Sequence, residues 1–327
     1  MSFYTSINKY GNSLLYRGYN DNGAAIEKRI KYEPTLYITS QDKDNPPCRG
    51  LDGWPLQPKR FPSMREANDF RDKYKELEAF KIYGNHNYVS QFITERFPTD
   101  IKFKKEYVNI VNFDIEVASS EGFPKPEDAL FPVISIALKS SKSRVYRVWG
   151  LDDYDHEKSE LKMGDDLIQY TKCDSEEELL TKFLAYWEKN PPDIITGWNI
   201  KFFDVPYLVN RLYRIGTPQA VKRLSPWKMV NDRNKTIMGR EHQFYDLIGI
   251  QQADYMELFK KFGYSYGTQE SYALDHIAHT VLGERKLSYA EHGSLHELYK
   301  NDHQKFIDYN IRDVQVVERI DEKMGLI

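Results

Sequence analysis

Two carboxylates stand two residues apart in the segment FDIEV at 113–117. The run around them, 107–117, is dense in β-branched residues and predicts a central β-strand. Residues two apart on a strand project from the same face, so Asp114 and Glu116 should stand side by side. Such a pair resists burial unless divalent cations bridge it. The alternative is a solvated sheet face, which is the more common situation for an isolated pair of this type.

A third carboxylate, Asp204, lies in the segment TGWNIKFFDVPY at 196–207. A predicted strand at 193–197 ends there in a loop, and Pro206 favours the start of a helix. Asp204 is therefore well placed to be the N-cap of that helix. A helix cap needs no catalytic role. Taken alone, this segment indicates a cap more often than a metal ligand.

Tyr309 and Asp313 stand four residues apart in a long helix predicted to start near Asp302. That spacing puts both side chains on one helix face, where they can reach a single point. The alternative is an amphipathic helix whose tyrosine is partly buried. Each segment alone has an ordinary structural explanation, but four carboxylates ordered on a strand, in a loop before a helix and on a late helix form a specific pattern.

The elements that must position these residues follow from hydrophobic patterning. Two more strands and several helices are expected around the first strand, at 132–140 and 144–150 for the strands and at about 175–190, 206–213, 253–262 and 271–283 for the helices. This order predicts a mixed central β-sheet with crossover helices, an α/β (mixed α+β) fold for residues 106–327.

Residues 1–105 are expected to form a separate, small β-rich domain with helices. Asn20 and Gly23 bound a turn sequence typical of antiparallel hairpins. Ser63 followed by Glu66 forms a capping box, which predicts a helix through roughly Phe80. The domain boundary is placed near Lys105.

Composition limits the partners, the redox compartment and the location that the chain can have. The 327 residues include 46 basic and 49 acidic side chains, a formal net charge of −3, so a polyanionic partner must be met by local basic patches. The two cysteines, Cys48 and Cys173, have no zinc-site or disulfide spacing, which favours a reducing compartment. No signal peptide and no membrane-spanning run is seen, so we expect a soluble cytoplasmic protein.

The three segments together resemble the DEDDy exonucleases, and among them the proofreading domain of family B DNA polymerases. The motifs FDIE, NxxxFDxPY and YxxxD stand in the expected order. The segment GTQESYALDHIAHTVLGERKLSY resembles the family between its second and third motifs. MSFYTSI and KRFPSMREANDF resemble the N-terminal domain of T4-like phage polymerases. The resemblance covers essentially the whole chain, and it implies a ribonuclease H-like 3′-to-5′ exonuclease domain after the small N-terminal domain.

The resemblance also implies roles for the acidic residues. Hydrolysis of a phosphodiester is served by two Mg²⁺ or Mn²⁺ ions, which take oxygen ligands. Asp114 would bridge both ions, Glu116 and Asp313 would complete the nucleophile-side ion, and Asp204 would act chiefly through water on the second. Tyr309 would orient the attacking water, because its unperturbed pKa near 10 makes it a poor general base.

Substrate contacts are implied at other positions. Phe123 matches a stacking residue, Asn199 a substrate-contacting asparagine, and Lys286 a lysine near the scissile phosphate, although a single lysine is usually solvated surface. The stretch 231–245 is either a basic hairpin that holds separated strands or an exposed loop. The expected partners are a single-stranded DNA 3′ end and primer-template DNA, with no membrane.

The chain shows no motif of a polymerase palm domain, so we expect no DNA synthesis by it alone. Either a fragment or one piece of a split polymerase is expected, in the second case with a separate polymerase-domain chain as partner. The alternatives are an RNA-binding, autoregulatory module and a docking subunit. If a phage encodes the chain, the host cytoplasm is its expected location.

Overall fold

The structure is a computed structural model of the 327-residue chain, and it describes residues 2–119, 122–237, 239–285, 287 and 290–327. The chain divides into two compact units, Met1–Tyr107 and Val108–Ile327. The assignment of 1–105 and 106–327 as separate domains stays a prediction, because a compact unit need not fold alone.

The first unit is rich in β-structure, as expected from the sequence. Its elements are β1 (Phe3–Tyr10), β2 (Ser13–Tyr19), β3 (Ala25–Lys31), β4 (Thr35–Thr39), β5 (Cys48–Arg49), β6 (Pro55–Arg60), β7 (Ile82–Tyr83), α1 (Met64–Tyr74), α2 (Tyr88–Arg96) and the 3-10 helix η1 (Lys105–Tyr107). Strands β1, β2 and β3 form an antiparallel sheet. The predicted turn lies between β2 and β3, where Gly23 N–H donates to the carbonyl of Asn20 at 3.1 Å. Gly23 has a φ of +78°, which glycine adopts without strain.

Helix α1 begins where the capping box predicts. Ser63 is its N-cap, and the Ser63 hydroxyl accepts a hydrogen bond from Glu66 N–H at 3.1 Å. The helix ends at Tyr74 rather than near Phe80, so its predicted end was wrong. The ring centroid of Phe80 lies 5.2 Å from that of Tyr74 and 6.0 Å from that of Phe70. The chain must turn back to make these contacts, because ten residues of continuous helix would span about 15 Å.

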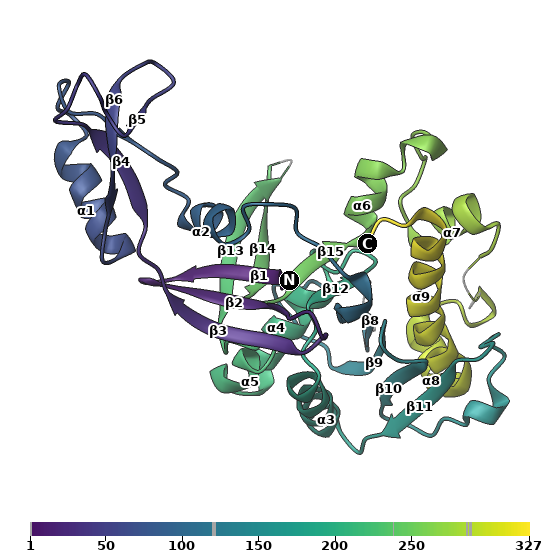
Figure 1. Cartoon of the computed structure of the whole chain (residues 1–327). Helices are drawn as coiled ribbons and strands as arrows, with labels where there is room; N and C mark the ends of the chain where they lie inside the picture. Colours follow the sequence, from purple (N-terminus) through teal and green to yellow (C-terminus); the bar gives the residue numbers. More distant parts are fainter. Residues whose placement is uncertain (1, 120–121, 238, 286, 288–289) are drawn as a thin grey trace. The chain divides into compact units, whose positions relative to one another are not determined.

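The second unit is built on a mixed sheet, which Figure 1 shows together with the helices beside it. Its strands in spatial order are β11 (Leu167–Lys172), β10 (Val145–Gly150), β9 (Val133–Ser140), β8 (Ile110–Val117), β12 (Ile194–Gly197) and β15 (Gln251–Asp254). Strand β8 pairs antiparallel with β9 and parallel with β12, so it is an interior strand. The expected mixed central sheet is confirmed.

Helices flank this sheet on both faces, as predicted. They are η2 (His156–Lys158), α3 (Glu176–Lys189), α4 (Asp204–Ile215), α5 (Pro218–Lys222), α6 (Tyr255–Phe262), η3 (Tyr264–Tyr266), α7 (Leu274–Leu282), η4 (Ala290–His292), α8 (Leu295–Asn301) and α9 (His303–Met324). Strands β13 (Val230–Ile237) and β14 (Arg240–Leu247) form a separate antiparallel hairpin. In the part of the chain that the structure describes, no helix has both the length and the apolar character needed to cross a membrane.

Buried apolar side chains pack on both faces of the sheet. On one face, Phe113 and Ile115 of β8 join a cluster with α3 and α4, and the ring of Phe113 lies 5.9 Å from that of Trp187. On the other face, Tyr146 of β10 clusters with Phe306 and other residues of α8 and α9. Burial of each such side chain contributes roughly 1.5–3 kcal/mol to the stability of the fold. The odd-numbered residues of β8 therefore face α3, and the even-numbered ones face α9.

Candidate active site

Strand β8 carries its polar residues on the face toward α9. Asn112, Asp114 and Glu116 alternate with the apolar residues that fill the opposite face. Asn112 Nδ2 donates to the carbonyl of Val314 in α9 at 2.6 Å. Asn310 Nδ2, also from α9, donates to Asp114 Oδ2 at 2.7 Å. These two bonds hold α9 across the acidic face of the strand.

Three carboxylates meet where α9 crosses β8. Oxygen atoms of Asp114, Glu116 and Asp313 all lie within 4.8 Å of one another, close enough to share a metal ion. Glu116 and Asp313 are buried and Asp114 is half-buried. At such a separation two unit charges repel by about 3–4 kcal/mol at an effective dielectric constant near 20. A hard divalent cation, which prefers oxygen ligands, would remove this repulsion, so the donor set fits such an ion.

Tyr309 lies one helical turn before Asp313 on α9. Its side chain is buried and joins the apolar cluster between α9 and the sheet. Helix α9 begins directly after Asp302, as predicted, and the Asp302 carboxylate accepts a hydrogen bond from Lys305 N–H at 2.9 Å. This cap fixes the start of the helix, and the spacing of four then keeps Tyr309 and Asp313 on one face.

Asp204 does not cap a helix, so the N-cap prediction was wrong. Helix α4 begins at Asp204 itself, Phe203 occupies the N-cap position, and no side-chain cap bond is made there. The Asp204 side chain points back to the sheet instead. Its Oδ1 accepts a hydrogen bond from the backbone N–H of Ile115 at 3.1 Å. Ile115 is the residue between the two carboxylates of β8, so Asp204 is tied to the strand that carries them.

The environment of Asp204 opposes its ionisation. Burial raises the pKa of Asp204 to about 7, and the charges of Asp254 and Asp313 act in the same direction, against the hydrogen bond from the strand. Among the described residues, the cluster with mutual separations below 4.8 Å contains three acids and not Asp204. The structure therefore brings Asp204 to the neighbourhood of the other acids, but outside their closest group.

A tight backbone turn between β12 and α4 directs Asp204 toward β8. Gly197 has a φ of +156°, and a Cβ at this position would lie 2.5 Å from the carbonyl oxygen of Phe113. Asn199 follows in the left-handed region with a φ of +67°, which asparagine tolerates better than most residues. Its carbonyl accepts the N–H groups of residues 202 and 203, both at 3.1 Å. Asn199 thus shapes the turn, and its contact with DNA stays a prediction.

Phe123 lies on the loop 122–132, between β8 and β9. Its side chain is 76% exposed, which is unusual for a phenylalanine and leaves its ring free to stack on a base. The ring centroid lies 4.8 Å from that of Phe203, the residue directly before Asp204. The predicted stacking residue therefore packs on the residue that precedes Asp204, and its contact with DNA stays a prediction.

Side chains of α4 hold this loop in place. Tyr207, Asn210 and Arg211 all bond to backbone atoms of residues 126–131, at distances of 2.8–3.1 Å. Arg211, which is buried, also forms a two-point ion pair with the half-buried Glu176 of α3, at 2.8 and 2.7 Å. The helix that begins at Asp204 therefore also positions the loop that carries Phe123.

The structure does not test two other predicted substrate contacts, the stretch 231–245 and Lys286. The stretch 231–245, apart from residue 238, lies in the hairpin of β13 and β14, in which β13 is mostly exposed and Arg233 pairs with Asp246 at 2.6 Å. Its role in holding separated DNA strands stays a prediction. Lys286 lies outside the described residues.

Sequence reasoning missed Asn310 and Ser135, which orient Asp114. Asn310 is 0% exposed; its Oδ1 accepts a hydrogen bond from the Ser135 hydroxyl at 2.7 Å while its amide nitrogen donates to Asp114. The available signal was a polar residue on an apolar helix face, because Ile307 lies three residues before Asn310 and Val314 four residues after it. A buried amide of this kind needs partners on the facing strands.

An acidic cluster formed by an interior strand and a crossing helix, with a further buried aspartate tied to the same strand, is the arrangement expected of a metal-dependent phosphodiester hydrolase. Comparison with known proteins defines the family. The model of the exonuclease domain of DNA polymerase family B matches residues 83–277, more than half of the chain. The chain therefore belongs to DNA polymerase family B, and it carries that family's 3′-to-5′ exonuclease domain, as the resemblance predicted.

Individual relatives agree with this assignment. The DNA-directed DNA polymerase of Escherichia phage RB69 is 31% identical over 343 positions, which cover 99% of this chain, and that of Enterobacteria phage T4 is 29% identical over the same extent. The DNA polymerase delta catalytic subunit of Candida albicans is 24% identical over 78% of the chain. The chain spans 37% of the length of the two phage relatives. The expected ribonuclease H-like fold, preceded by a small β-rich region, is confirmed.

Proposed function

We propose that this chain removes 3′-terminal nucleotides from single-stranded DNA and from the frayed ends of primer-template DNA, as the proofreading part of a DNA polymerase. The observation that carries the proposal is the group of three carboxylates within 4.8 Å of one another inside an exonuclease domain of family B. The frayed end is the suitable substrate, because a base-paired end cannot reach a buried group of acids without separation of the strands.

The proposed cofactors are two Mg²⁺ or Mn²⁺ ions. Asp114, Glu116 and Asp313 would hold them together, and Asp204 would serve the second ion. When bound, such ions acidify the attacking water and neutralise the charge that develops on the phosphate. Burial and the charges of Asp254 and Asp313 raise the pKa of Asp204, and a cation beside this carboxyl group would favour its ionised form, the form that binds metal.

The chain's own residues would orient the reacting groups. The Tyr309 hydroxyl would position the attacking water, since its buried ring lies one turn from Asp313. Asn310 would hold the Asp114 carboxylate in the orientation that binds the ions. Phe123 would stack on a base near the 3′ end, where stacking contributes roughly 1–3 kcal/mol per base.

The proposed partner is a polymerase domain. The two phage relatives are named DNA-directed DNA polymerases, and this chain corresponds to 37% of their length. We also propose that the chain acts in the cytoplasm in which its DNA is replicated, the host cytoplasm if a phage encodes it. The alternative of an RNA-binding module gains no support from these relatives.

A directional degradation assay tests the proposal. The purified chain should shorten 5′-labelled single-stranded DNA stepwise in Mg²⁺ or Mn²⁺, should stop at a 3′-terminal inverted nucleotide, and should be inactive in EDTA. The variant Asp114→Ala/Glu116→Ala should lose this activity by several orders of magnitude.

A matched control removes two carboxylates with the same spacing elsewhere. Asp42 and Asp44 are both exposed, and the variant Asp42→Ala/Asp44→Ala should keep wild-type activity. Full activity of the Asp114/Glu116 variant, or cleavage that proceeds past a blocked 3′ end, would contradict the proposal.

A further inference from the structure

A pocket of about 640 Å³ lies against α9, the helix that also carries Asp313 of the acidic cluster. We call it the arginine groove; its lining consists of Glu160, Leu161, Lys162, Glu284, Arg285, Leu287, Arg312 and Arg319. Its volume falls in the range of pockets that hold small ligands. Arg312 directly precedes Asp313 in α9, so the groove and the proposed active site share one helix, with these two side chains about 100° apart around its axis. Figure 1 shows α7, α8 and α9 beside one another in this part of the unit.

One wall of the groove is fixed to α9. The Asp308 carboxylate accepts hydrogen bonds from the hydroxyls of Tyr154 and Ser159, both at 2.7 Å, and from Glu160 N–H at 3.1 Å. Further along α9, Gln315 Nε2 donates to the carbonyl of Lys162 at 2.9 Å. The segment 154–162 is therefore attached to the helix at both ends, and the groove is built before any ligand arrives.

Two guanidinium groups converge in the groove. Arg312 donates to Glu284 Oε2 at 2.7 Å and to Gln315 Oε1 at 2.5 Å. Arg319 also donates to Glu284 Oε2. Hydrogen bonds from Arg319 and Arg312 hold the pKa of Glu284 below its usual range, against its partial burial, so this carboxylate is charged at neutral pH. A single carboxylate oxygen thus faces two fixed positive charges.

The groove keeps an excess of positive charge and of donors. Its described lining contains four cations and two carboxylates, and one of the cations, Arg285, pairs with Asp275 outside the lining at 2.7 Å. Apart from that pair, three cations remain against two carboxylates. Each guanidinium carries five N–H donors in a rigid fork, and the three bonds described above occupy a minority of the ten that the pair offers. Arg312 is 14% exposed and Arg319 40% exposed, so the pair is partly desolvated yet reachable from solvent. A phosphate group matches this charge and this geometry.

We propose that the arginine groove binds a backbone phosphate of the single DNA strand whose 3′ end occupies the acidic cluster. The inference rests on the proposed exonuclease function and specifies how its substrate is gripped. A group of carboxylates repels phosphate, so the strand requires cations nearby to stay bound. The pair formed by Arg312 and Arg319 supplies them on the helix that also carries Asp313. The contact is to the backbone and is therefore independent of base sequence.

The salt dependence of binding tests this inference without any cleavage. The affinity of the full chain for a fluorescent oligothymidylate is measured in EDTA at several salt concentrations. Arg319→Gln should bind roughly tenfold more weakly, because a charge-assisted bond is lost. It should also reduce the slope of log affinity against log salt by about 0.7, the value for one phosphate contact on a single strand. Arg319→Lys should keep the slope, because the positive charge remains. It should still bind DNA more weakly, because the forked guanidinium group is lost.

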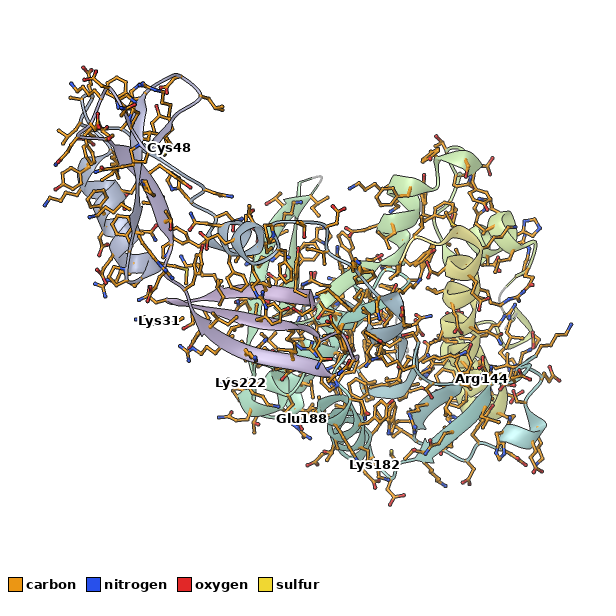
Figure 2. The ribbon with its side chains drawn as sticks, in the orientation of Figure 1. Lys31, Cys48, Arg144, Lys182, Glu188 and Lys222 are labelled. Atoms are coloured by element: carbon orange, nitrogen blue, oxygen red, sulfur yellow. The ribbon has the colours of Figure 1, made fainter. Side chains whose placement is uncertain are left out.

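A matched control exists on the other face of the sheet. Glu188 of α3, labelled in Figure 2, is shared by Arg223 and Lys228 in the same way that Glu284 is shared by two arginines. Arg223 is 31% exposed, close to Arg319. Arg223→Gln should keep both the wild-type slope and the wild-type Michaelis constant.

Three outcomes separate the possibilities. If Arg319→Gln and Arg223→Gln have the same slope and the same Michaelis constant for DNA, the groove does not hold the strand. If Arg319→Gln loses only inhibition by free thymidine monophosphate, the groove binds released nucleotide, which overturns the inference for the strand. If the wild-type chain cleaves neither DNA nor thymidine 5′-monophosphate p-nitrophenyl ester, the proposed function fails. The slope measured in EDTA still decides for or against the groove in that case.

Discussion

The hydrogen-bonded chain from Ser135 through Asn310 to Asp114 leads to a quantitative prediction. Replacing Asn310 by alanine removes the 2.7 Å bond to Asp114 Oδ2 without adding a charge. A hydrogen bond to a charged group contributes about 1.5–3 kcal/mol. If the orientation of Asp114 is worth that much to ion binding, Asn310→Ala should lose roughly 10- to 100-fold in activity, the range found for outer partners of metal ligands.

The loss should be visible in the metal dependence. Single-turnover rates are measured on 5′-labelled single-stranded DNA over a series of Mg²⁺ concentrations. The concentration for half-maximal rate should rise in Asn310→Ala, and high Mg²⁺ should restore much of the rate. Asn310→Asp should have lower activity than Asn310→Ala. A carboxylate placed 2.7 Å from Asp114 adds a repulsion of about 6 kcal/mol at an effective dielectric constant near 20.

A double variant tests whether Ser135 acts through Asn310. Ser135→Ala alone should lose less than about tenfold in activity, because the hydrogen bond from Asn310 to Asp114 remains. The variant Ser135→Ala/Asn310→Ala should then resemble Asn310→Ala, since coupled residues are not additive. A wild-type metal dependence in Asn310→Ala, or full additivity of the two losses, would refute the reasoning.

Other parts of the second unit give further expected outcomes. Arg211→Met leaves Glu176, whose side chain is 13% exposed, without its ion-pair partner. The variant should lose about 3–5 kcal/mol of stability, a fall of roughly 6–20 °C in the unfolding temperature by calorimetry. An unchanged temperature would contradict this. Phe123→Ala should raise the Michaelis constant for single-stranded DNA roughly 5- to 100-fold, and Phe123→Trp should restore it. Burial lowers the pKa of His303, so this side chain binds more protons in the unfolded chain below pH 6.5, and its own contribution to stability should fall on acidification by up to about 1.4 kcal/mol per pH unit. Urea unfolding at pH 7 and pH 5 should show a smaller fall in His303→Gln, and an equal fall would exclude this group.

The alternation of strand β8 could be predicted because it depends on local geometry alone. A strand has a period of two, so residues 113 and 115 had to face one side and Asp114 and Glu116 the other. The same holds for Tyr309 and Asp313 on α9, whose spacing of four belongs to any helix. Chemistry that depends on spacing within one element can therefore be predicted from the amino-acid sequence alone.

Elements defined by their neighbours were harder to predict. Strand β15, with the sequence QQAD, has no apolar alternation, and its extended form follows from its pairing with β12, in which Ile194 faces Gln251. Strand β11 is an edge strand with exposed positions, so its pattern is weak. Helix α1 ended early because Phe80 folds back on Phe70, a contact that no local propensity encodes.

The error on Asp204 shows why the rest of the site needed the fold. From the sequence, an aspartate two residues before a proline favours an N-cap, and local geometry alone supports it. The carboxylate bonds instead to Ile115 N–H, on a strand 89 residues earlier in the sequence. That donor is available only because β8 pairs with β12 and brings the turn at Gly197 against Phe113. A cap would have turned the carboxylate toward its own helix, whereas the observed bond directs it to the strand that carries the other acids. The pairing of two strands thus brings a residue with an ordinary local role into the neighbourhood of the acidic cluster.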